Sequence, residues 1–175
     1  DPELLFYDYT LTNEAGTHTV LDPYSLSMAA YTGNGSHGRG AIINLQKETL
    51  KPEREYPYIT LQKREDAIIY EVSVRDFTAS PDSGVKNIPG TYKAFIEKIP
   101  YLRELGITHI QLMPVLNFYY TNETNRQYED AGTVHNNNYN WGYDPLNYNV
   151  PEGSYSTDPY RPEVRIREFK QMVQA

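Results

Sequence analysis

Apolar residues follow two different spacings along the chain, and the change comes near residue 62. In the first part, stretches such as LLFYDYTLT (residues 4–12) alternate apolar and polar side chains. A period of two residues predicts β-strands, and the sequence NEAG at 13–16 predicts a turn after this one. Further short strand candidates are THTVLDPY (17–24), AIINL (41–45) and YPYITL (56–61). Residues 1–62 are therefore predicted to form the end of a small β domain, a sandwich whose first strands precede residue 1.

The second part begins with a pattern of strand, helix and strand. AIIYEVSV (67–74) and ITHIQLM (107–113) are continuous runs of apolar and β-branched residues, which is typical of strands buried on both faces. Between them, residues 91–106 carry apolar side chains at helical spacing. Pro100 divides this segment into two short helices, because proline fits only the first turn of a helix, and Gly106 is a helix stop. This order predicts a right-handed unit with two parallel strands.

A long segment with little periodicity follows the second strand, over residues 114–160. Loops of this length are uncommon in a compact domain unless they are functional, and this one follows the carboxyl end of a parallel strand, where α/β proteins bind ligands. A last helix is predicted to begin at Pro162-Glu163. Its predicted apolar face consists of Val164, Ile166, Phe169 and Val173.

The two ends of the sequence resemble cut points. The chain starts inside an apolar, strand-like stretch without a leader and stops inside a helical pattern without a cap. Helices normally end at a glycine or a capping residue. We therefore expect the chain to be a fragment of a longer polypeptide.

Composition excludes several classes of function. The net charge of −7 argues against a nucleic-acid partner, because such proteins present a basic surface. The absence of cysteine excludes disulfides and thiolate metal sites, which suits a cytosolic protein and equally a secreted one. No apolar run is long enough to span a membrane. Tyrosine is abundant, with 17 residues against 5 phenylalanines, and its flat ring with a polar tip favours sugars as ligands.

Metal and nucleotide motifs are weak. The segment at 33–38 matches G-x-G-x-x-G, but a strand-like stretch follows it where a dinucleotide site needs a helix. The four histidines, His18, His37, His109 and His135, lack metal-ligand spacing. Asp130 and the turn at Asp82 offer oxygen atoms that suit calcium, so calcium stays a minor alternative and no other metal site is predicted.

The strongest candidate for a ligand site is the stretch YNWGYDPLNY at 139–148. It holds four tyrosines and the only tryptophan of the chain. Pro145 and three asparagines disfavour a core strand, and Gly142 with Pro145 disfavours a helix, so we predict a loop. Its aromatic side chains either pack against one another, as in many compact loops, or bind a ligand, and the residues alone leave both readings open.

The segment YNWGYDP (139–145) looks like the signature of type I pullulanases, the starch-debranching glycoside hydrolases of the α-amylase superfamily. Other segments support this resemblance in the same order. They are LDPYSLSMAAY (21–31), IIYEVSVRDFT (68–78), ELGITHIQLMPV (104–115) and NYNVPEGSYSTDP (147–159). The resemblance covers nearly the whole chain, and the heptapeptide is the part that is specific within the superfamily.

The resemblance implies an α/β fold, the start of a (β/α)8 TIM barrel preceded by the end of a starch-binding-like β-sandwich. Residues 1–62 would belong to the sandwich and its linker. Residues 63–175 would form strand one, helix one, strand two, the long substrate loop and the start of helix two. The implied reaction is hydrolysis of α-1,6-glucosidic linkages in pullulan and amylopectin by a retaining double displacement with two carboxylates.

The resemblance places those carboxylates after later strands of the barrel, so no catalytic residue is expected in this chain. Glu71 and Asp76 flank the first strand, and we interpret Asp76 as structural. In the loop, the resemblance implies that Tyr143 stacks on the sugar before the scissile bond. Asp144 would accept hydrogen bonds from that sugar or brace the floor of the site. The residues implied to shape the loop are Tyr139, Asn140 and Trp141.

The implied partners are an α-glucan and the remaining part of the same enzyme, either as missing sequence or as a second chain. No cofactor is required of this chain. The resemblance implies a secreted or bacterial cell-surface enzyme, and the sequence leaves a cytoplasmic one open. Two alternatives remain: an isoamylase-type debranching or branching enzyme, and a non-catalytic glycan-binding module.

Overall fold

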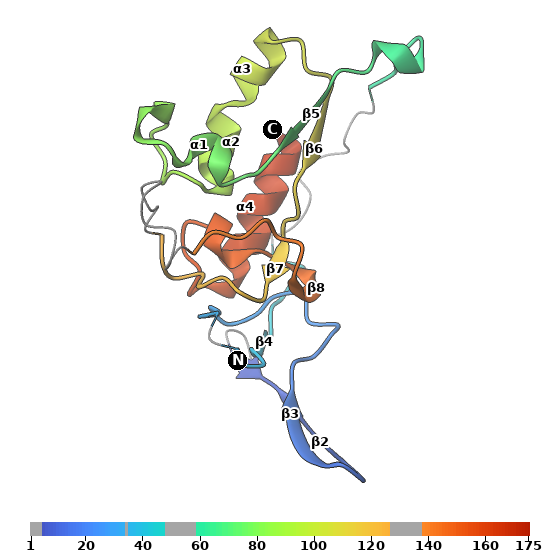
Figure 1. The fold of residues 1–175 in the computed structure, drawn as a ribbon, viewed down its shortest axis with the longest axis vertical. Helices are drawn as coiled ribbons and strands as arrows, with labels where there is room; N and C mark the ends of the chain where they lie inside the picture. The colour runs from blue at the N-terminus through green and yellow to red at the C-terminus, as the bar shows by residue number, and fades with distance from the viewer. Residues whose placement is uncertain (1–4, 34, 48–58, 127–137) are drawn as a thin grey trace.

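Two parallel strands, joined by helices, form the centre of the second part of the chain, as predicted. The structure, a computed structural model, describes residues 5–33, 35–47, 59–126 and 138–175. In it, β5 (Ile69–Val72) pairs in parallel with β6 (His109–Leu112) (Figure 1). The connection contains α1 (Asp76–Ala79), the 3-10 turn η3 (Pro81–Ser83), α2 (Tyr92–Glu97) and α3 (Ile99–Glu104).

The interruption between α2 and α3 follows from the proline at position 100. Proline lacks an amide hydrogen and its ring clashes with the carbonyl group four residues earlier, so α2 ends at Glu97 and Pro100 lies in the first turn of α3. Gly106 follows α3 with a φ of +82°, a conformation that favours glycine after a helix. Both predicted boundaries are confirmed.

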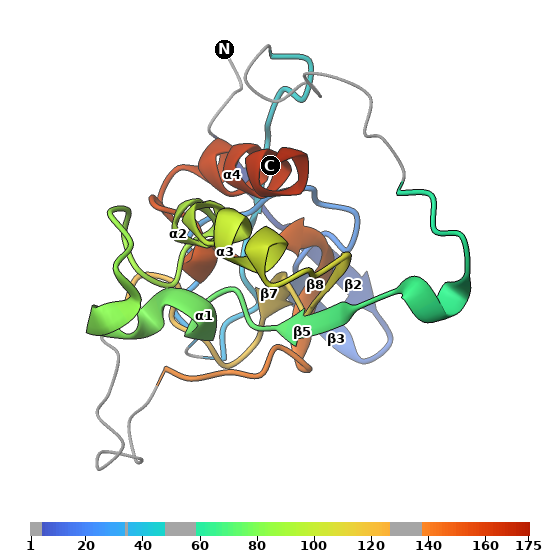
Figure 2. The ribbon, with the colours of Figure 1, turned by 90° about the horizontal axis from the view of Figure 1, so that it is seen from above.

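The helices bury the apolar core against one side of the strand pair. The last helix, α4 (Pro162–Gln174), packs against α2, and Figure 2 shows α2, α3 and α4 on the same side of β5 and β6. The core cluster consists of Val72, Val74, Tyr92, Phe95, Leu102, Phe118, Tyr155 and Met172. The prediction for the apolar face of α4 is wrong at one position, because Val173 is 51% exposed and Met172 is buried in its place.

The two parallel strands do not bury both faces in this structure, in contrast to the prediction. Ile69 is 61% exposed and Ile110 is 39% exposed. Within the described residues, β5 and β6 pair only with each other, so one face and both outer edges lack cover. The apolar sequence that predicted two-sided burial therefore leaves exposed isoleucines where only two strands are present.

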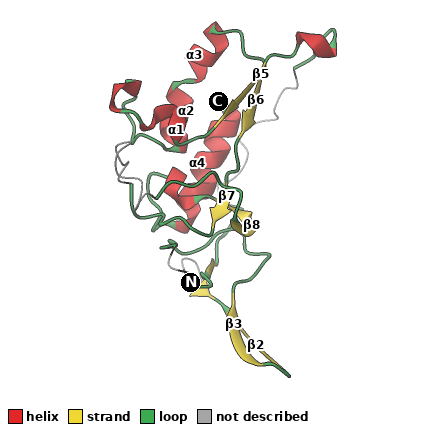
Figure 3. Cartoon of the chain, in the orientation of Figure 1, coloured by secondary structure: helices red, strands yellow, loops and turns green. Residues whose placement is uncertain are grey.

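The N-terminal part forms two small antiparallel pairs. β1 (Phe6–Tyr7) pairs with β4 (Gly40–Ala41), and β2 (Tyr9–Asn13) forms a hairpin with β3 (Gly16–Val20) through the predicted turn. Figures 1 and 3 show this hairpin projecting from the rest of the molecule and the helices confined to the later part of the chain. A sandwich is not formed among the described residues, and residues 56–58 of one strand candidate lie outside them.

The segment predicted as one long loop contains a second antiparallel pair. β7 (Leu116–Phe118) pairs with β8 (Pro145–Pro151), with shifts of register around Asn117. The prediction that residues 139–148 form a loop is therefore wrong from Pro145 onward. Pro145 is the first residue of β8, a position where proline interrupts no hydrogen bond within the ladder. Two 3-10 turns, η2 (Arg64–Asp66) and η4 (Gly153–Tyr155), complete the elements.

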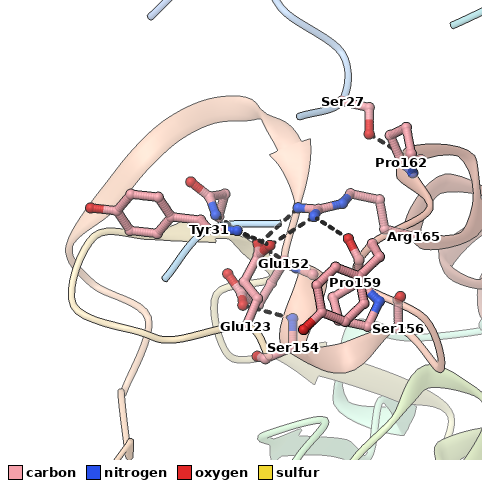
Figure 4. Close-up of polar contacts among 12 residues, drawn as sticks. Ser27, Tyr31, Glu123, Glu152, Ser154, Ser156, Pro159, Pro162 and Arg165 are labelled. Carbon is pink, nitrogen blue, oxygen red and sulfur yellow. Dashed lines mark hydrogen bonds and ion pairs between the residues drawn. The ribbon is translucent and has the colours of Figure 1, made fainter. Parts of the chain in front are cut away.

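A fully buried ion pair joins these elements. The guanidinium of Arg165 on α4 donates from Nη1 to Glu123 Oε1 at 2.8 Å and from Nη2 to Glu123 Oε2 at 2.7 Å. Both side chains are 0% exposed (Figure 4). Burial by itself lowers the pKa of Arg165, but the charge and hydrogen bonds of Glu123 raise it above its ordinary value. The pair is therefore charged, and each partner compensates the desolvation of the other.

Glu123 also binds three other segments of the chain. Its Oε1 accepts from Gly153 N and from Asn117 Nδ2, both at 2.9 Å. Its Oε2 accepts from Tyr31 N at 2.9 Å, and Glu123 N donates to Tyr31 O at 2.8 Å. One carboxylate thus connects the N-terminal part with β7, η4 and α4. No helix among the described residues has the length and apolar character needed to cross a membrane.

Replacing Glu123 by glutamine should strongly destabilise the fold. The substitution leaves the buried guanidinium of Arg165 without a compensating charge, which costs about 3–5 kcal/mol. Urea unfolding followed by far-UV circular dichroism measures this loss of free energy.

The matched control is Arg161→Gln, which removes the ion pair between Arg161 and Glu163 one turn earlier. The Arg161 side chain is 61% exposed, so this change should cost less than about 1 kcal/mol. Equal effects of the two substitutions would show that the buried pair does not carry the role described here.

Candidate functional site

The aromatic loop, defined here as residues 138–144, lies beside the carboxyl ends of both parallel strands. Arg75, three residues beyond β5, donates from Nη1 to Asn138 O at 3.0 Å. Pro114, two residues beyond β6, lies behind Gly142, because a Cβ built on this glycine would meet Pro114 Cβ at 2.9 Å. The long segment after β6 thus returns to the edge where ligands bind in parallel α/β proteins.

Hydrogen bonds hold both ends of the aromatic loop. Asn138 Oδ1 accepts from Asn122 N at 2.7 Å, and Asn138 Nδ2 donates to the carbonyl oxygens of Asn122 and Asn125 at 2.7 and 2.9 Å. At the other end, Asp144 O accepts from Tyr119 N at 2.9 Å. Asp144 Oδ2 accepts from Tyr120 N at 3.1 Å. The loop is therefore fixed to the residues that follow β7.

Asn140 and Asp144 form the internal frame of the aromatic loop. Asn140 Oδ1 accepts from Gly142 N at 2.7 Å, and Asn140 Nδ2 donates to Asp144 Oδ2 at 3.1 Å. Both side chains are half-buried. An asparagine whose side chain binds the backbone two residues later stabilises a tight turn. This geometry allows Asp144 to brace the loop, as one of its two predicted roles requires.

The aromatic side chains of the loop differ in exposure. Tyr139 is half-buried beneath the guanidinium of Arg75, whose Cζ lies 4.6 Å from the ring centroid. The rings of Tyr139 and Trp141 meet edge to face at 5.1 Å. Trp141 is 61% exposed and Tyr143 is 68% exposed. Burial raises the pKa of Tyr139, and the nearby charge of Asp76 raises it further, so its hydroxyl stays protonated.

Two large aromatic rings thus stay accessible on a loop whose backbone is held in place. Tyr120, next to Asp144, is also 71% exposed, and its ring meets that of Tyr119 edge to face. Open aromatic faces beside amide and carboxylate groups suit a ligand with apolar faces and hydroxyl groups. A sugar has both.

Comparison with known proteins identifies the family. No protein-family model matches the chain. The chain is 42% identical to pullulanase A of Streptococcus pneumoniae over an alignment that covers 96% of the chain and 14% of that protein. It is 33% identical to the pullulanase of Bacillus subtilis (strain 168), over 95% of the chain and 22% of that protein. The chain belongs to the pullulanase family.

Solved structures of pullulanases contain the same fold segment. The pullulanase SAP of group B Streptococcus in complex with maltotetraose superposes with a TM-score of 0.87 at 39% identity, covering 97% of this chain and 22% of that chain. A product complex of the glycogen-degrading pneumococcal virulence factor SpuA gives a TM-score of 0.86 at 41% identity, covering 96% of this chain and 18% of that chain. The α/β class of this pullulanase segment is thus established, and the chain spans less than a quarter of these relatives.

The predicted site residues all lie in the aromatic loop, but several of their supports were not predicted. The sequence analysis missed Arg75 and Asn138, which bind the start of the loop, and Tyr120, which binds its end. Arg75 lies directly after a predicted strand, and a charged residue at that place is a signal that could have found it. Asn138 lies in a run of asparagines, NNN at 136–138, and nothing in the sequence separates it from its neighbours.

Glu152 is a buried carboxyl group behind the aromatic loop of this pullulanase segment. It is 0% exposed. Burial and then the charge of Glu123 raise the pKa of Glu152 to about 8. A raised pKa is a property of catalytic acids, but Glu152 Oε1 accepts from Ser154 N at 2.9 Å and Oε2 accepts from Phe118 N at 2.8 Å. Both oxygens therefore bind the backbone, and the group joins β8 to β7.

The calcium alternative is not tested by the structure. Asp130 and His135 lie outside the described residues, and Asp82 Oδ1 accepts from Ser80 Oγ. In the described part of the chain, no three acidic or histidine side chains are grouped so that they could hold a metal ion. The glycine-rich match at 33–38 precedes the strand β4, where a dinucleotide site has a helix.

Gly142→Ala should distort the aromatic loop. Gly142 has a φ of +89°, and its added Cβ would lie 2.7 Å from Phe118 Cε1 as well as against Pro114. We expect the free energy of unfolding to fall by about 1–3 kcal/mol, measured by urea unfolding.

Gly84→Ala is the matched control, because Gly84 has a φ of +72° and no atom within 4 Å of the added Cβ. Both substitutions carry the same kind of backbone strain, so a difference between them reports the collision. An equal loss of stability would show that the close packing behind Gly142 is unimportant.

Proposed function

We propose that this chain forms part of a pullulanase, a glycoside hydrolase that cleaves α-1,6-glucosidic linkages in pullulan, amylopectin and related α-glucans. The observation that carries the proposal is the YNWGYDP loop, held at the carboxyl ends of two parallel strands with Trp141 and Tyr143 exposed. The relatives named above support it, since one of them binds maltotetraose. Pullulan hydrolysis faster than glycogen hydrolysis would favour this function over that of an isoamylase-type enzyme.

The proposed reaction is a retaining double displacement, in which one carboxylate attacks the anomeric carbon and a second protonates the leaving oxygen. The acidic groups near the loop in this chain have other partners. Asp76 Oδ1 lies 3.4 Å from Arg75 Nε, and Glu152 is enclosed by backbone donors. We therefore assign no catalytic residue to residues 1–175 and expect the reacting carboxylates in other parts of the enzyme.

The proposed substrate contacts lie on the aromatic loop. Tyr143 would stack on the sugar before the scissile bond, because its ring is more than two-thirds exposed. Asp144 would brace the loop through its bonds with Asn140 and Tyr120 and offer its remaining lone pairs to sugar hydroxyls. We propose that Tyr139, Asn140 and Trp141 set the shape of this surface.

Tyr143→Ala should weaken binding of maltotetraose by about tenfold or more, which corresponds to about 1.4 kcal/mol. The substitution removes the exposed ring while the backbone bonds of the loop remain. Isothermal titration calorimetry on the complete protein measures the affinity, and pullulan hydrolysis measures the effect on turnover.

Tyr101→Ala is the control, since Tyr101 is a 52% exposed tyrosine on α3. It should leave both binding and hydrolysis unchanged. Unaltered binding and hydrolysis after Tyr143→Ala would overturn the role given to the loop. Binding without hydrolysis by the unmodified protein would favour a non-catalytic glycan-binding module.

The proposed architecture is a (β/α)8 barrel over residues 63–175 and beyond, preceded by a β-sandwich that includes residues 1–62. Exposed apolar surface on β5 and β6 supports it. An apolar cavity of about 530 Å³ lies between β6, α3 and α4, lined among others by Leu102, Ile107, Ile110, Leu112 and Met172. Further strands and helices of the barrel would cover this surface. We also propose secretion or display on a bacterial surface, which fractionation of the source cells tests.

Native mass spectrometry of the purified protein should show a species well above the 20.2 kDa of this chain. The added mass would be the polypeptide that completes the barrel. A lone 20.2 kDa species with a cooperative unfolding transition would contradict the barrel, because two parallel strands would then be stable without it.

A further inference from the structure

Arg75 makes three contacts from one side chain at the start of the aromatic loop. Its Nη1 donates to Asn138 O at 3.0 Å, its Nε lies 3.4 Å from Asp76 Oδ1, and its Cζ lies 4.6 Å from the centroid of the Tyr139 ring. The side chain is only 16% exposed. The contact with Asp76 orients the guanidinium, so that one edge meets the backbone of the loop and one face meets an aromatic ring.

The aromatic contacts continue outward from Tyr139 to Trp141. These two rings are nearly perpendicular, at 88°, with their centroids 5.1 Å apart. Among the described residues, Trp141 packs against no other aromatic ring in this way. Arg75, Tyr139 and Trp141 therefore form a stack that begins next to β5 and ends in solvent.

The backbone bonds of the loop do not fix the aromatic rings. Asn138 and Asp144 hold the two ends of the backbone, but the side chains of Tyr139 and Trp141 can still rotate about their own bonds. A cation over the face of a tyrosine restrains the plane of that ring. The plane of Tyr139 in turn decides against which surface the indole of Trp141 rests.

We propose that Arg75 is a positioning residue, which holds Tyr139 and through it Trp141 in the orientation that a glycan meets. Arginine suits this task because its planar fork donates hydrogen bonds at its edge while its face stacks on an aromatic ring. Lysine offers a point charge and cannot do both. The part of the inference that concerns the glycan rests on the proposed function, whereas the stack itself does not.

The test compares Arg75→Lys with the unmodified complete protein labelled with 5-fluorotryptophan. The fluorine resonance of residue 141 is assigned by its loss in Trp141→Phe. Arg75→Lys should move this resonance toward that of free 5-fluorotryptophan and raise the KM for pullulan about three- to tenfold, with kcat within about twofold. The urea midpoint should stay unchanged, because Arg75 contacts the loop and Asp76 and is not part of the core cluster.

Two further variants make the result specific. Tyr139→Leu removes the ring between Arg75 and Trp141, so it should move the resonance in the same direction, and adding Arg75→Lys to it should produce no further shift. Arg103→Lys makes the same chemical change on α3 and should alter neither resonance nor KM.

The outcomes separate this inference from the proposed function. A resonance and a KM that are both unchanged in Arg75→Lys would overturn the positioning role, whatever the protein binds. A resonance that moves in Arg75→Lys and Tyr139→Leu, in a protein that binds no maltotetraose, would establish the stack and reject the glycan function. Additive shifts in the double variant would overturn the relay through Tyr139.

Discussion

The ion pair between Glu123 and Arg165 is the contact on which the remaining structure depends. Two charges are fully removed from water at this point, and such burial is tolerated only when every charged atom finds partners. Glu123 meets this requirement by binding the guanidinium in a two-pronged geometry and accepting from three further groups. Since those groups come from β7, η4 and the N-terminal part, satisfying one carboxylate fixes the relative places of segments far apart in the sequence.

The same constraint reaches the candidate site through a short chain of bonds. Glu123 fixes the turn that contains Asn122, and Asn122 binds the side chain of Asn138 at the start of the aromatic loop. Glu152 fixes Phe118, whose neighbours Tyr119 and Tyr120 bind Asp144 at the loop's end. A loop held in this way pays less conformational entropy when a ligand arrives. The burial of charge beneath the site thus favours preorganised aromatic rings above it.

The elements that the sequence predicted correctly are those with a local physical cause. Pro100 divides a helix whatever surrounds it, and Gly106 ends one. The elements that it missed depend on distant partners. β8 begins at a proline because β7 lies beside it, and Arg165 is buried because Glu123, 42 residues away in sequence, neutralises it. The five loop residues were found through their resemblance to a family motif, and their supports, Arg75 and Asn138, carry no comparable local signal.

The exposed strands and the aromatic loop set complementary limits on what this chain determines. Arg75, Asn138 and Pro114 fix the loop relative to the carboxyl ends of β5 and β6. Ile69 and Ile110 leave the same two strands without cover on one face, so their place in a larger sheet depends on what packs there. The distance between the exposed rings and any reacting carboxylate is therefore set by the packing around β5 and β6, and apolar contacts far from the sugar become a determinant of catalysis.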